Sequence, residues 1–245
     1  MRLVSIRAKK LAHALLSNSG RRALRFGVAA SIEHEAAFRN YTFRTIVDVG
    51  ANVGQFALFA LKRFPKATIY SFEPLEDCWN KFDSVIGPDT RVRLYRYGIG
   101  QEDSTSLINV TNENDSSSIL TPSGAQEESF GTVVVERKNI ELRRLASLLT
   151  SNDLVAPALL KIDVQGFELD VLKGSKELLN CFDCIYVEAS YVELYRYQAL
   201  AGDVVGFLQE NGFEMRGVFN QYADNKRGPL QADFLFAKTD GTSTI

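Results

Sequence analysis

From Thr45 onward, short segments rich in β-branched residues alternate with longer amphipathic segments. The strand-like TIVDVG precedes the helix-like VGQFALFALKRF, and TIYSFEP precedes LEDCWNKFDSVI. Later in the chain, ALLKIDVQG leads into FELDVLKGSKELL, and CIYVEAS precedes GDVVGFLQENG. Such alternation is typical of a parallel sheet with helices on both faces. The sequence therefore predicts an α/β fold with a doubly wound, mostly parallel sheet, whose ligands lie beyond the carboxyl ends of the strands.

The bulk composition narrows the class of protein. A chain of 245 residues that is 45% hydrophobic can bury a full core in one large domain. Its net charge of −2 provides no global basic field, so we expect no nucleic-acid partner. The apolar runs are far shorter than the roughly 20 residues of a transmembrane helix, and charged residues interrupt the basic N-terminus where a signal peptide would need an apolar core. The expected location is cytoplasmic.

The chain divides into two expected regions. Residues 1–40 carry apolar residues at three- and four-residue spacing, which predicts an N-terminal helical extension, and residues 41–245 form the α/β domain. Within that domain, residues 101–131 are rich in Ser, Asn, Thr and Gly and predict an insertion of short strands and loop over the ligand edge. The basic residues of the extension could contact an anionic membrane surface weakly, although a solvated helix face is the simpler interpretation.

The first predicted strand ends in a glycine turn, DVGANVG, that is typical of a nucleoside site. Gly50 and Gly54 let the backbone turn tightly and approach a ligand, and the helix that follows points its amide groups into the same space. Glu73 closes the second predicted strand, where a carboxylate can accept hydrogen bonds from ribose hydroxyls. A dinucleotide fingerprint is disfavoured because Asn52 and Gln55 occupy the positions of its second and third glycines.

Asp48 constrains the rest of the ligand. A carboxylate at this strand end suits an ammonium group better than a pyrophosphate, which predicts S-adenosylmethionine, a nucleoside with an amino-acid tail. A glycine turn that merely packs is the alternative. Ile99 and Gly100 follow the third predicted strand, where an adenine edge would lie. The predicted cofactor-binding residues are Asp48, Gly50, Ala51, Asn52, Gly54, Glu73, Ile99, Gly100 and Asp163.

Six sequence blocks occur in a characteristic order between Thr45 and Lys238: VDVGANVGQF, SFEP, SSSIL, LLKIDVQGFELDVLKG, YVEAS and ADFLFAK. In this order they resemble the FkbM family of S-adenosylmethionine-dependent methyltransferases. The resemblance implies a seven-stranded Rossmann-like methyltransferase sheet with a final antiparallel strand. It also implies O-methyl transfer to a hydroxyl of a sugar, glycoconjugate or related metabolite. Gln165 departs from the family pattern, where Glu is common, and this weakens any role that needs a second carboxylate there.

Methyl transfer to an alcohol requires alignment of the acceptor and removal of its proton. His13 and His34 both lie upstream of the predicted sheet, so carboxylates are the better candidates for the base. Asp163, at the end of the fourth predicted strand, is the predicted base, with a buried pairing to Lys161 as the alternative. The other catalytic candidates are Glu168, which a helix dipole alone would also favour, and Glu188, at the end of the fifth predicted strand.

Several interpretations of single residues and motifs stay open. Asp163 and Glu188 could hold Mg²⁺, but a third ligand is not evident, so no metal site is predicted. Cys181 and Cys184 form a lone C-x-x-C and are interpreted as small apolar residues. Ser116, Ser117 and Ser118 are candidates for hydrogen bonds to adenine or acceptor, and Tyr191 and Tyr195 are expected to share one helical face. The alternatives to the O-methyltransferase are a non-catalytic nucleoside-binding module and a metal-dependent O-methyltransferase acting on a natural product.

Overall fold

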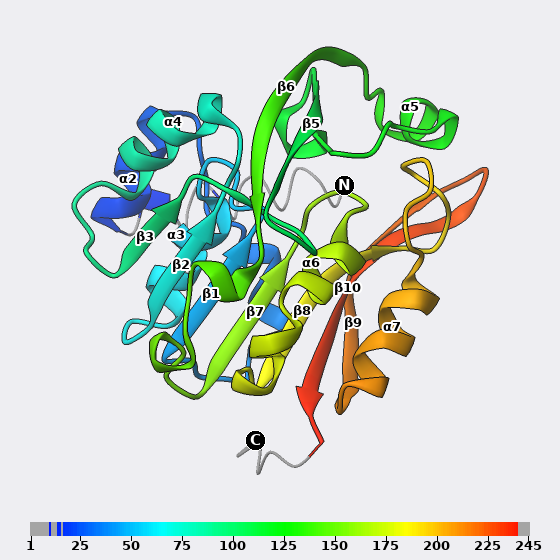
Figure 1. Cartoon of the computed structure of the whole chain (residues 1–245). Helices are drawn as coiled ribbons and strands as arrows, with labels where there is room; N and C mark the ends of the chain where they lie inside the picture. Colours follow the sequence, from blue (N-terminus) through cyan, green and yellow to red (C-terminus); the bar gives the residue numbers. More distant parts are fainter. Residues whose placement is uncertain (1–9, 11–13, 16, 240–245) are drawn as a thin grey trace.

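The computed structural model describes residues 10, 14–15 and 17–239. Its centre is a seven-stranded sheet with the strand order β3-β2-β1-β7-β8-β10-β9 (Figure 1). The strands are β1 (Thr45–Val49), β2 (Thr68–Phe72), β3 (Val92–Tyr95), β7 (Ala158–Ile162), β8 (Cys184–Ser190), β9 (Phe213–Asp224) and β10 (Gly228–Lys238). The first five run parallel, whereas β10 is antiparallel to both β8 and β9. The predicted doubly wound, mostly parallel sheet is confirmed.

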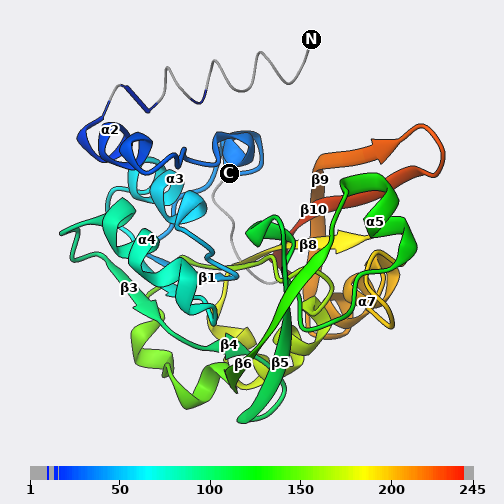
Figure 2. The same ribbon diagram turned by 90° about the horizontal axis from the view of Figure 1, so that it is seen from above.

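Helices cover both faces of this sheet. One face carries α2 (Asn18–Arg25), α3 (Gln55–Arg63) and α4 (Glu76–Ile86), and the other carries α6 (Glu168–Gly174) and α7 (Ala201–Glu210) (Figures 1 and 2). Successive strand residues point to opposite faces, so Ile46 packs in the first layer and Val47 in the second. Central parallel strands are buried on both faces, so their sequences consist mainly of apolar residues. In β1, all five residues are buried.

A second sheet stands over the carboxyl ends of the parallel strands (Figure 1). It contains β4 (Gly98–Ile99), β5 (Ser104–Thr111) and β6 (Val134–Arg143) in the order β4-β6-β5, with α5 (Gly124–Phe130) between the last two strands. The inserted structure therefore continues past the predicted residues 101–131 as far as β6. The segment RVRLYRYGIG, predicted as the third strand, is divided between the two sheets: β3 (Val92–Tyr95) belongs to the main sheet and β4 (Gly98–Ile99) to the small one.

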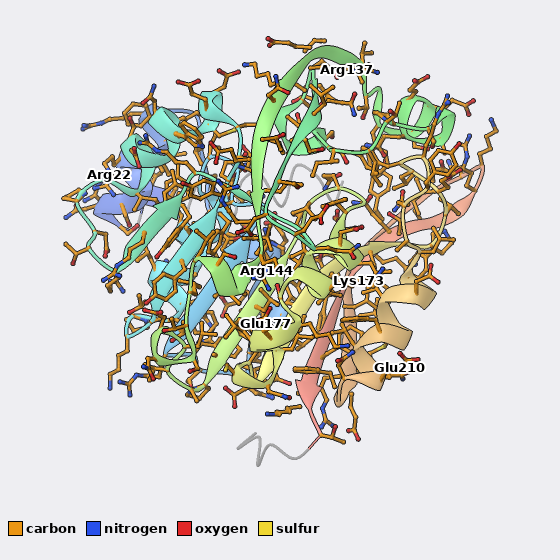
Figure 3. The ribbon with its side chains drawn as sticks, viewed as in Figure 1. Arg22, Arg137, Arg144, Lys173, Glu177 and Glu210 are labelled. Carbon is orange, nitrogen blue, oxygen red and sulfur yellow. The ribbon has the colours of Figure 1, made fainter. Side chains whose placement is uncertain are left out.

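Residues 29–39 are less helical than their spacing predicts. Residues 18–25 form α2, but the segment AASIEHEAAFR contains only a short 3-10 helix, Ile32–Ala36. Tertiary packing decides this conformation: Phe38 is fully buried, with its ring centroid 4.8 Å from that of Tyr186. Arg22 anchors α2 by donating hydrogen bonds to the carbonyl oxygens at the end of α4 (Figure 3). Four basic residues of the predicted extension, Arg2, Arg7, Lys9 and His13, lie outside the described residues.

Polar contacts also join the segment after β6 to the main domain. Arg144 forms an ion pair with Glu177 of the 3-10 helix Lys176–Cys181, at the surface near α6 (Figure 3). Within the described part of the chain, no helix has the length and apolar character needed to cross a bilayer.

Replacing Phe38 with Ala should destabilise the fold. The ring lies among Phe43, Phe56, Phe59, Phe64 and Tyr186. Its removal leaves a cavity that costs about 3–5 kcal/mol of unfolding free energy. Urea denaturation followed by circular dichroism measures this loss. Phe26→Ala, at a side chain that is 44% exposed, is the control and should change stability by less than about 0.5 kcal/mol. Equal effects of the two substitutions would contradict the packing described.

Candidate active site

A cavity of about 400 Å³ opens at the carboxyl ends of β1, β2, β7 and β8, beneath the small sheet. Its volume falls in the range of small-molecule sites. Seven of the eleven predicted cofactor-binding and catalytic residues line it: Gly50, Ala51, Asn52, Glu73, Ile99, Asp163 and Glu188. The cavity lies where the strand order reverses beside β1, which is the expected place for a ligand in a doubly wound sheet.

Asp48 does not line the cavity, because its carboxylate is engaged inside the sheet. It is fully buried and stands in register with Lys161 of β7. The Lys161 Nζ lies 3.1 Å from Asp48 Oδ1 and donates a 3.1 Å hydrogen bond to the carbonyl oxygen of Gly50. Burial acts to lower the pKa of Lys161, but Asp48 and Asp163 outweigh it and raise that pKa above its usual value. An ion pair with Lys161 thus takes the place of the predicted contact between Asp48 and a ligand ammonium.

The glycines of the turn are needed for contacts within the protein. Gly50 has a φ of 79°, and a β-carbon there would lie 1.8 Å from the backbone oxygen of Asp163. Gly54 begins α3 with a φ of 92°, and its β-carbon would lie 3.2 Å from the ring of Phe82. The backbone of Gly100 packs directly against α6. Gly50 lines the cavity, whereas Gly54 and Gly100 lie outside it.

Glu73 presents a fixed carboxylate at one end of the cavity. Its Oε2 accepts a 2.8 Å hydrogen bond from the backbone of Asn52, and its Oε1 accepts one of 2.8 Å from the backbone of Leu75. Burial raises the pKa of Glu73 to about 7, against the opposing effect of these two amides. Ile99 lines the same cavity from the small sheet. A carboxylate with spare lone pairs suits the ribose hydroxyls of an adenosine, and an apolar wall beside it suits the adenine ring.

The serines of the insertion hold the small sheet in place. The Ser118 hydroxyl donates a 2.6 Å hydrogen bond to the backbone oxygen of Gln165. Ser117 accepts one from the backbone of β5, and the carbonyl of Ser116 accepts one from Tyr195. Ser117 and Ser118 also line the cavity, so this loop forms part of its roof.

Gln165 links the two carboxylates on the opposite side of the cavity. Its Nε2 donates hydrogen bonds of 2.8 Å to Asp163 Oδ1 and 2.9 Å to Glu188 Oε2, and its Oε1 lies 3.0 Å from the Tyr195 hydroxyl. Gln231 donates to the other oxygen of Glu188 at 2.7 Å. Burial, followed by the charges of Asp163 and neighbouring acids, raises the pKa of Glu188 well above its usual value. An amide at position 165 joins two acidic groups that a third carboxylate would repel.

Asp163 and Glu188 are the two oxygen ligands considered for Mg²⁺, and each accepts a hydrogen bond from the Gln165 amide. Gln231 donates to the second oxygen of Glu188. Among the residues that the structure describes, no three His, Cys, Asp or Glu side chains gather as a metal site. Cys181 and Cys184 are free thiols, and Cys184 is buried in β8.

Comparison with known proteins identifies the family. Residues 48–215, more than half of the chain, match the Methyltransferase FkbM domain. The chain belongs to this family. It is 31% identical over 160 residues to the 2-O-methyltransferase NoeI of Sinorhizobium fredii, a match that covers 62% of this chain and 66% of that one. It is 29% identical over 144 residues to the hexuronic acid methyltransferase AglP of Haloferax volcanii, covering 58% of this chain and 54% of that one.

The fold is shared with solved methyltransferase structures. The structure of Sp1610 from Streptococcus pneumoniae, described as a putative tRNA (m1A22) methyltransferase in complex with S-adenosyl-L-methionine, matches with a TM-score of 0.50. Sequence identity is 12%, and the match covers 84% of this chain and 71% of the other. This similarity supports the methyltransferase sheet assigned to the FkbM-family chain.

Glu168 lies outside the cavity of this FkbM-family protein. It is 3% exposed, and its Oε1 accepts hydrogen bonds of 2.9 Å from the backbone of Gly166 and 3.2 Å from that of Val164. Burial raises its pKa to about 7. Glu168 therefore fixes the loop after β7, in agreement with the alternative interpretation of its position at a helix start, and does not line the cavity.

The prediction that Tyr191 and Tyr195 share one helical face is wrong. Residues 191–199 form bends and turns, and the side chain of Gln198 accepts hydrogen bonds from the backbone of Leu194 and Tyr195. Tyr195 is 1% exposed, whereas Tyr197 is 94% exposed. Tyr191 is partly buried and packs against the core beneath β10. Local side-chain hydrogen bonds thus outweigh the helical spacing.

Sequence reasoning missed a second polar group at the cavity wall. His34, Asn220 and Asp233 line the cavity, and all three lie close to the hydroxyl of Tyr186. His34 was set aside because it precedes the sheet in sequence, yet tertiary packing carries its segment back over α3. Because Asn220 is 186 residues away in the sequence, no local pattern indicates that the two side chains lie together.

The stability of the protein should fall as pH rises through neutrality. A glutamate has an ordinary pKa of 4.5, and Glu168 has one of about 7 when folded. Its stabilising effect is complete below about pH 4.5 and is lost as pH rises through about 7. Glu168→Gln should reduce the fall in unfolding free energy between pH 5 and pH 8 by up to about 3 kcal/mol. Urea denaturation at several pH values measures this.

Glu210→Gln is the matched control, since Glu210 is exposed at the end of α7 (Figure 3). Its profile should follow that of the unmodified protein. A Glu168→Gln profile parallel to the unmodified one would show that Glu168 is not a buried, titrating group.

Proposed function

We propose that this protein transfers the methyl group of S-adenosylmethionine to a hydroxyl of a sugar, glycoconjugate or related metabolite. The observation that carries the proposal is one continuous cavity with Glu73 at one end and Asp163 and Glu188 at the other. A ligand bound along it would place its nucleoside and its reacting centre over different strands. The family of the chain supports methyl transfer.

The nucleoside half of the cofactor is assigned to the side of β2. Glu73 would accept the ribose hydroxyls, since each of its oxygens uses one lone pair on a backbone amide and keeps another. Ile99 would face the adenine ring. This assignment agrees with the general role of an acidic residue that closes the second strand of such sheets.

The amino-acid tail is assigned to the turn after β1. Gly50 and Ala51 line the cavity there, beside Asp163. Asp163 is partly exposed, with 39% of its side chain accessible, whereas Asp48 is closed off by Lys161. We therefore assign the contact with the ammonium group to Asp163. The bound cofactor supplies an electrophilic methyl group with a neutral thioether as the leaving group.

The acceptor is assigned to the space beside Glu188. Its raised pKa favours the protonated form, which can donate a hydrogen bond to a sugar oxygen as well as accept one. The names of two relatives, a 2-O-methyltransferase and a hexuronic acid methyltransferase, support an oxygen atom of a carbohydrate as the methyl acceptor.

Incubation with methyl-labelled S-adenosylmethionine and a panel of neutral and acidic methyl glycosides tests the proposal. At least one glycoside should acquire label in an ether that survives dilute base, whereas a methyl ester on a carboxyl group would be hydrolysed. Glu73→Ala should weaken binding of S-adenosylhomocysteine at least tenfold by calorimetry, about 1.4 kcal/mol. Because the pKa of Glu73 is about 7, affinity should rise from pH 6 to pH 8, and Glu73→Gln should abolish this rise.

Glu76→Ala is the control, at an exposed glutamate in the first turn of α4, and should bind like the unmodified protein. Binding without transfer to any glycoside would contradict the sugar acceptor. No heat at millimolar S-adenosylhomocysteine would contradict the cofactor site as well.

A further inference from the structure

Four residues from separate elements form a second polar cluster at the far wall of the cavity. They are His34 from the 3-10 segment, Tyr186 from β8, Asn220 from β9 and Asp233 from β10. None of them is needed for the cofactor contacts assigned above. Asp233 stands directly opposite Glu188 across the β8–β10 pair, so the cluster adjoins the proposed acceptor space.

The hydrogen bonds of the cluster determine which nitrogen of His34 carries a proton. Tyr186 and Asn220 each donate to Asp233 Oδ2 at 2.7 Å. The single hydroxyl proton of Tyr186 is thereby used, and its oxygen can only accept. His34 Nδ1 lies 3.1 Å from that oxygen and 3.4 Å from Asp233 Oδ2. Asn220 Nδ2 also lies 3.3 Å from Nδ1, but its two protons have acceptors in Asp233 Oδ2 and the Tyr186 oxygen. A proton on Nδ1 therefore satisfies the remaining acceptors and leaves the lone pair of neutral imidazole on Nε2.

The charges of the cluster suit this arrangement. Burial acts to raise the pKa of Asp233, but hydrogen bonds from His34, Asn220 and Tyr186 outweigh it and hold the pKa below its usual value. Asp233 is therefore an anion at neutral pH. Burial, and next the charge of Asp233, raise the pKa of Tyr186, so its hydroxyl stays protonated. The Asp233 carboxylate therefore faces the His34 ring as a hydrogen-bond acceptor, with Oδ2 3.4 Å from Nδ1.

The backbone and the core hold these side chains in place. Asn220 has a φ of 46°, and β9 shifts its register against β10 between Gln231 and Asp233. Bulges of this kind redirect a side chain, and here Asn220 points at Asp233. The His34 ring packs at 5.4 Å from Phe56 and 5.4 Å from Tyr186, edge to face in both cases. The ring orientation is thus fixed before any ligand binds.

Other charged groups near His34 are already paired. On its own segment, Glu33 forms a 2.8 Å ion pair with Lys10, and both residues line the cavity. From β7, Lys161 lies 5.5 Å from the centre of the Phe56 ring and pairs with Asp48. Helix α3 contributes the rings of Phe56 and Phe59. Asp233 is therefore the carboxylate that acts most directly on the imidazole.

We propose that His34 is the base that removes the acceptor's proton, positioned by Asp233 through Tyr186; this inference rests on the proposed function. The acceptor O–H bond breaks and its proton moves to Nε2. The oxygen lone pair forms the new bond to the methyl carbon, and the electron pair of the breaking C–S bond leaves with the thioether. The free lone pair on Nε2 makes His34 a better placed base than the predicted Asp163, whose Oδ1 accepts a hydrogen bond from Gln165 and whose Oδ2 lies 3.9 Å from the Lys161 ammonium.

The protonation state of His34 can be tested without any acceptor. The chain has two histidines, so His13→Gln leaves His34 as the single imidazole for ¹⁵N NMR. We expect the neutral ring to carry its proton on Nδ1, and Asp233→Asn to lower the pH at which the ring titrates. A neutral ring protonated on Nε2, or a titration unchanged by Asp233→Asn, would overturn the proposal.

The kinetic test uses the glycoside that the unmodified protein methylates best. His34→Gln should lower kcat at least 100-fold with little change in S-adenosylhomocysteine affinity, as expected for loss of a general base. Tyr186→Phe keeps the packed ring and should lower kcat about tenfold. It should also shift the acidic limb of the kcat profile to lower pH, because the imidazolium loses its link to Asp233.

Glu35→Gln, at the exposed neighbour of His34, is the control and should leave kcat and the pH profile unchanged. Unaltered kcat in His34→Gln would refute the role of His34 while leaving the proposed function intact. Absence of transfer by the unmodified protein would refute the proposed function, and the NMR experiment would still decide the state of His34. S-adenosylhomocysteine binding by each variant verifies that it is folded.

Discussion

The ion pair between Asp48 and Lys161 is the interaction on which the geometry of the site depends. The two residues are register partners at the junction of β1 and β7, and both are buried. Removing one member of such a pair leaves a charge without compensation in the core, which typically costs 3–5 kcal/mol. Lys161 also binds the carbonyl of Gly50 and lies 3.9 Å from Asp163. One ammonium group therefore positions both loops that form the floor of the cavity.

Strand geometry extends this pair into a polar row across the sheet. Side chains alternate between the faces of a strand. Asp48, Lys161 and Glu188 therefore follow apolar residues on the α3 side, and Asp233 precedes one because β10 is antiparallel. The row passes from the strands assigned to the cofactor to those assigned to the acceptor. His34 lies at its end, where the N-terminal segment packs over α3. The aromatic cluster around Phe38 therefore helps to position the site, as the sheet does.

The sequence predicts those parts of the site that depend on local pattern. The strand–turn–helix junction brings Gly50 and Asn52 to the cavity, and the ends of strands bring Glu73, Asp163 and Glu188 to it. Asp48 was assigned to a ligand because its partner Lys161 is 113 positions away and is revealed only by strand register. Glu168 was ambiguous because a helix start and a catalytic acid share the same local pattern. His34 and Asn220 could not be found, since their positions follow from tertiary packing and from a bulge in β9.

We expect adenosine to lie between Glu73 and Ile99 and the amino-acid tail to run along Gly50 toward Asp163. A crystal structure with S-adenosylhomocysteine would show this arrangement. The ribose hydroxyls should lie within hydrogen-bonding distance of the Glu73 carboxylate, and the sulfur atom should face the space between Glu188 and His34. A ligand bound elsewhere, or a sulfur that faces away from that space, would contradict it.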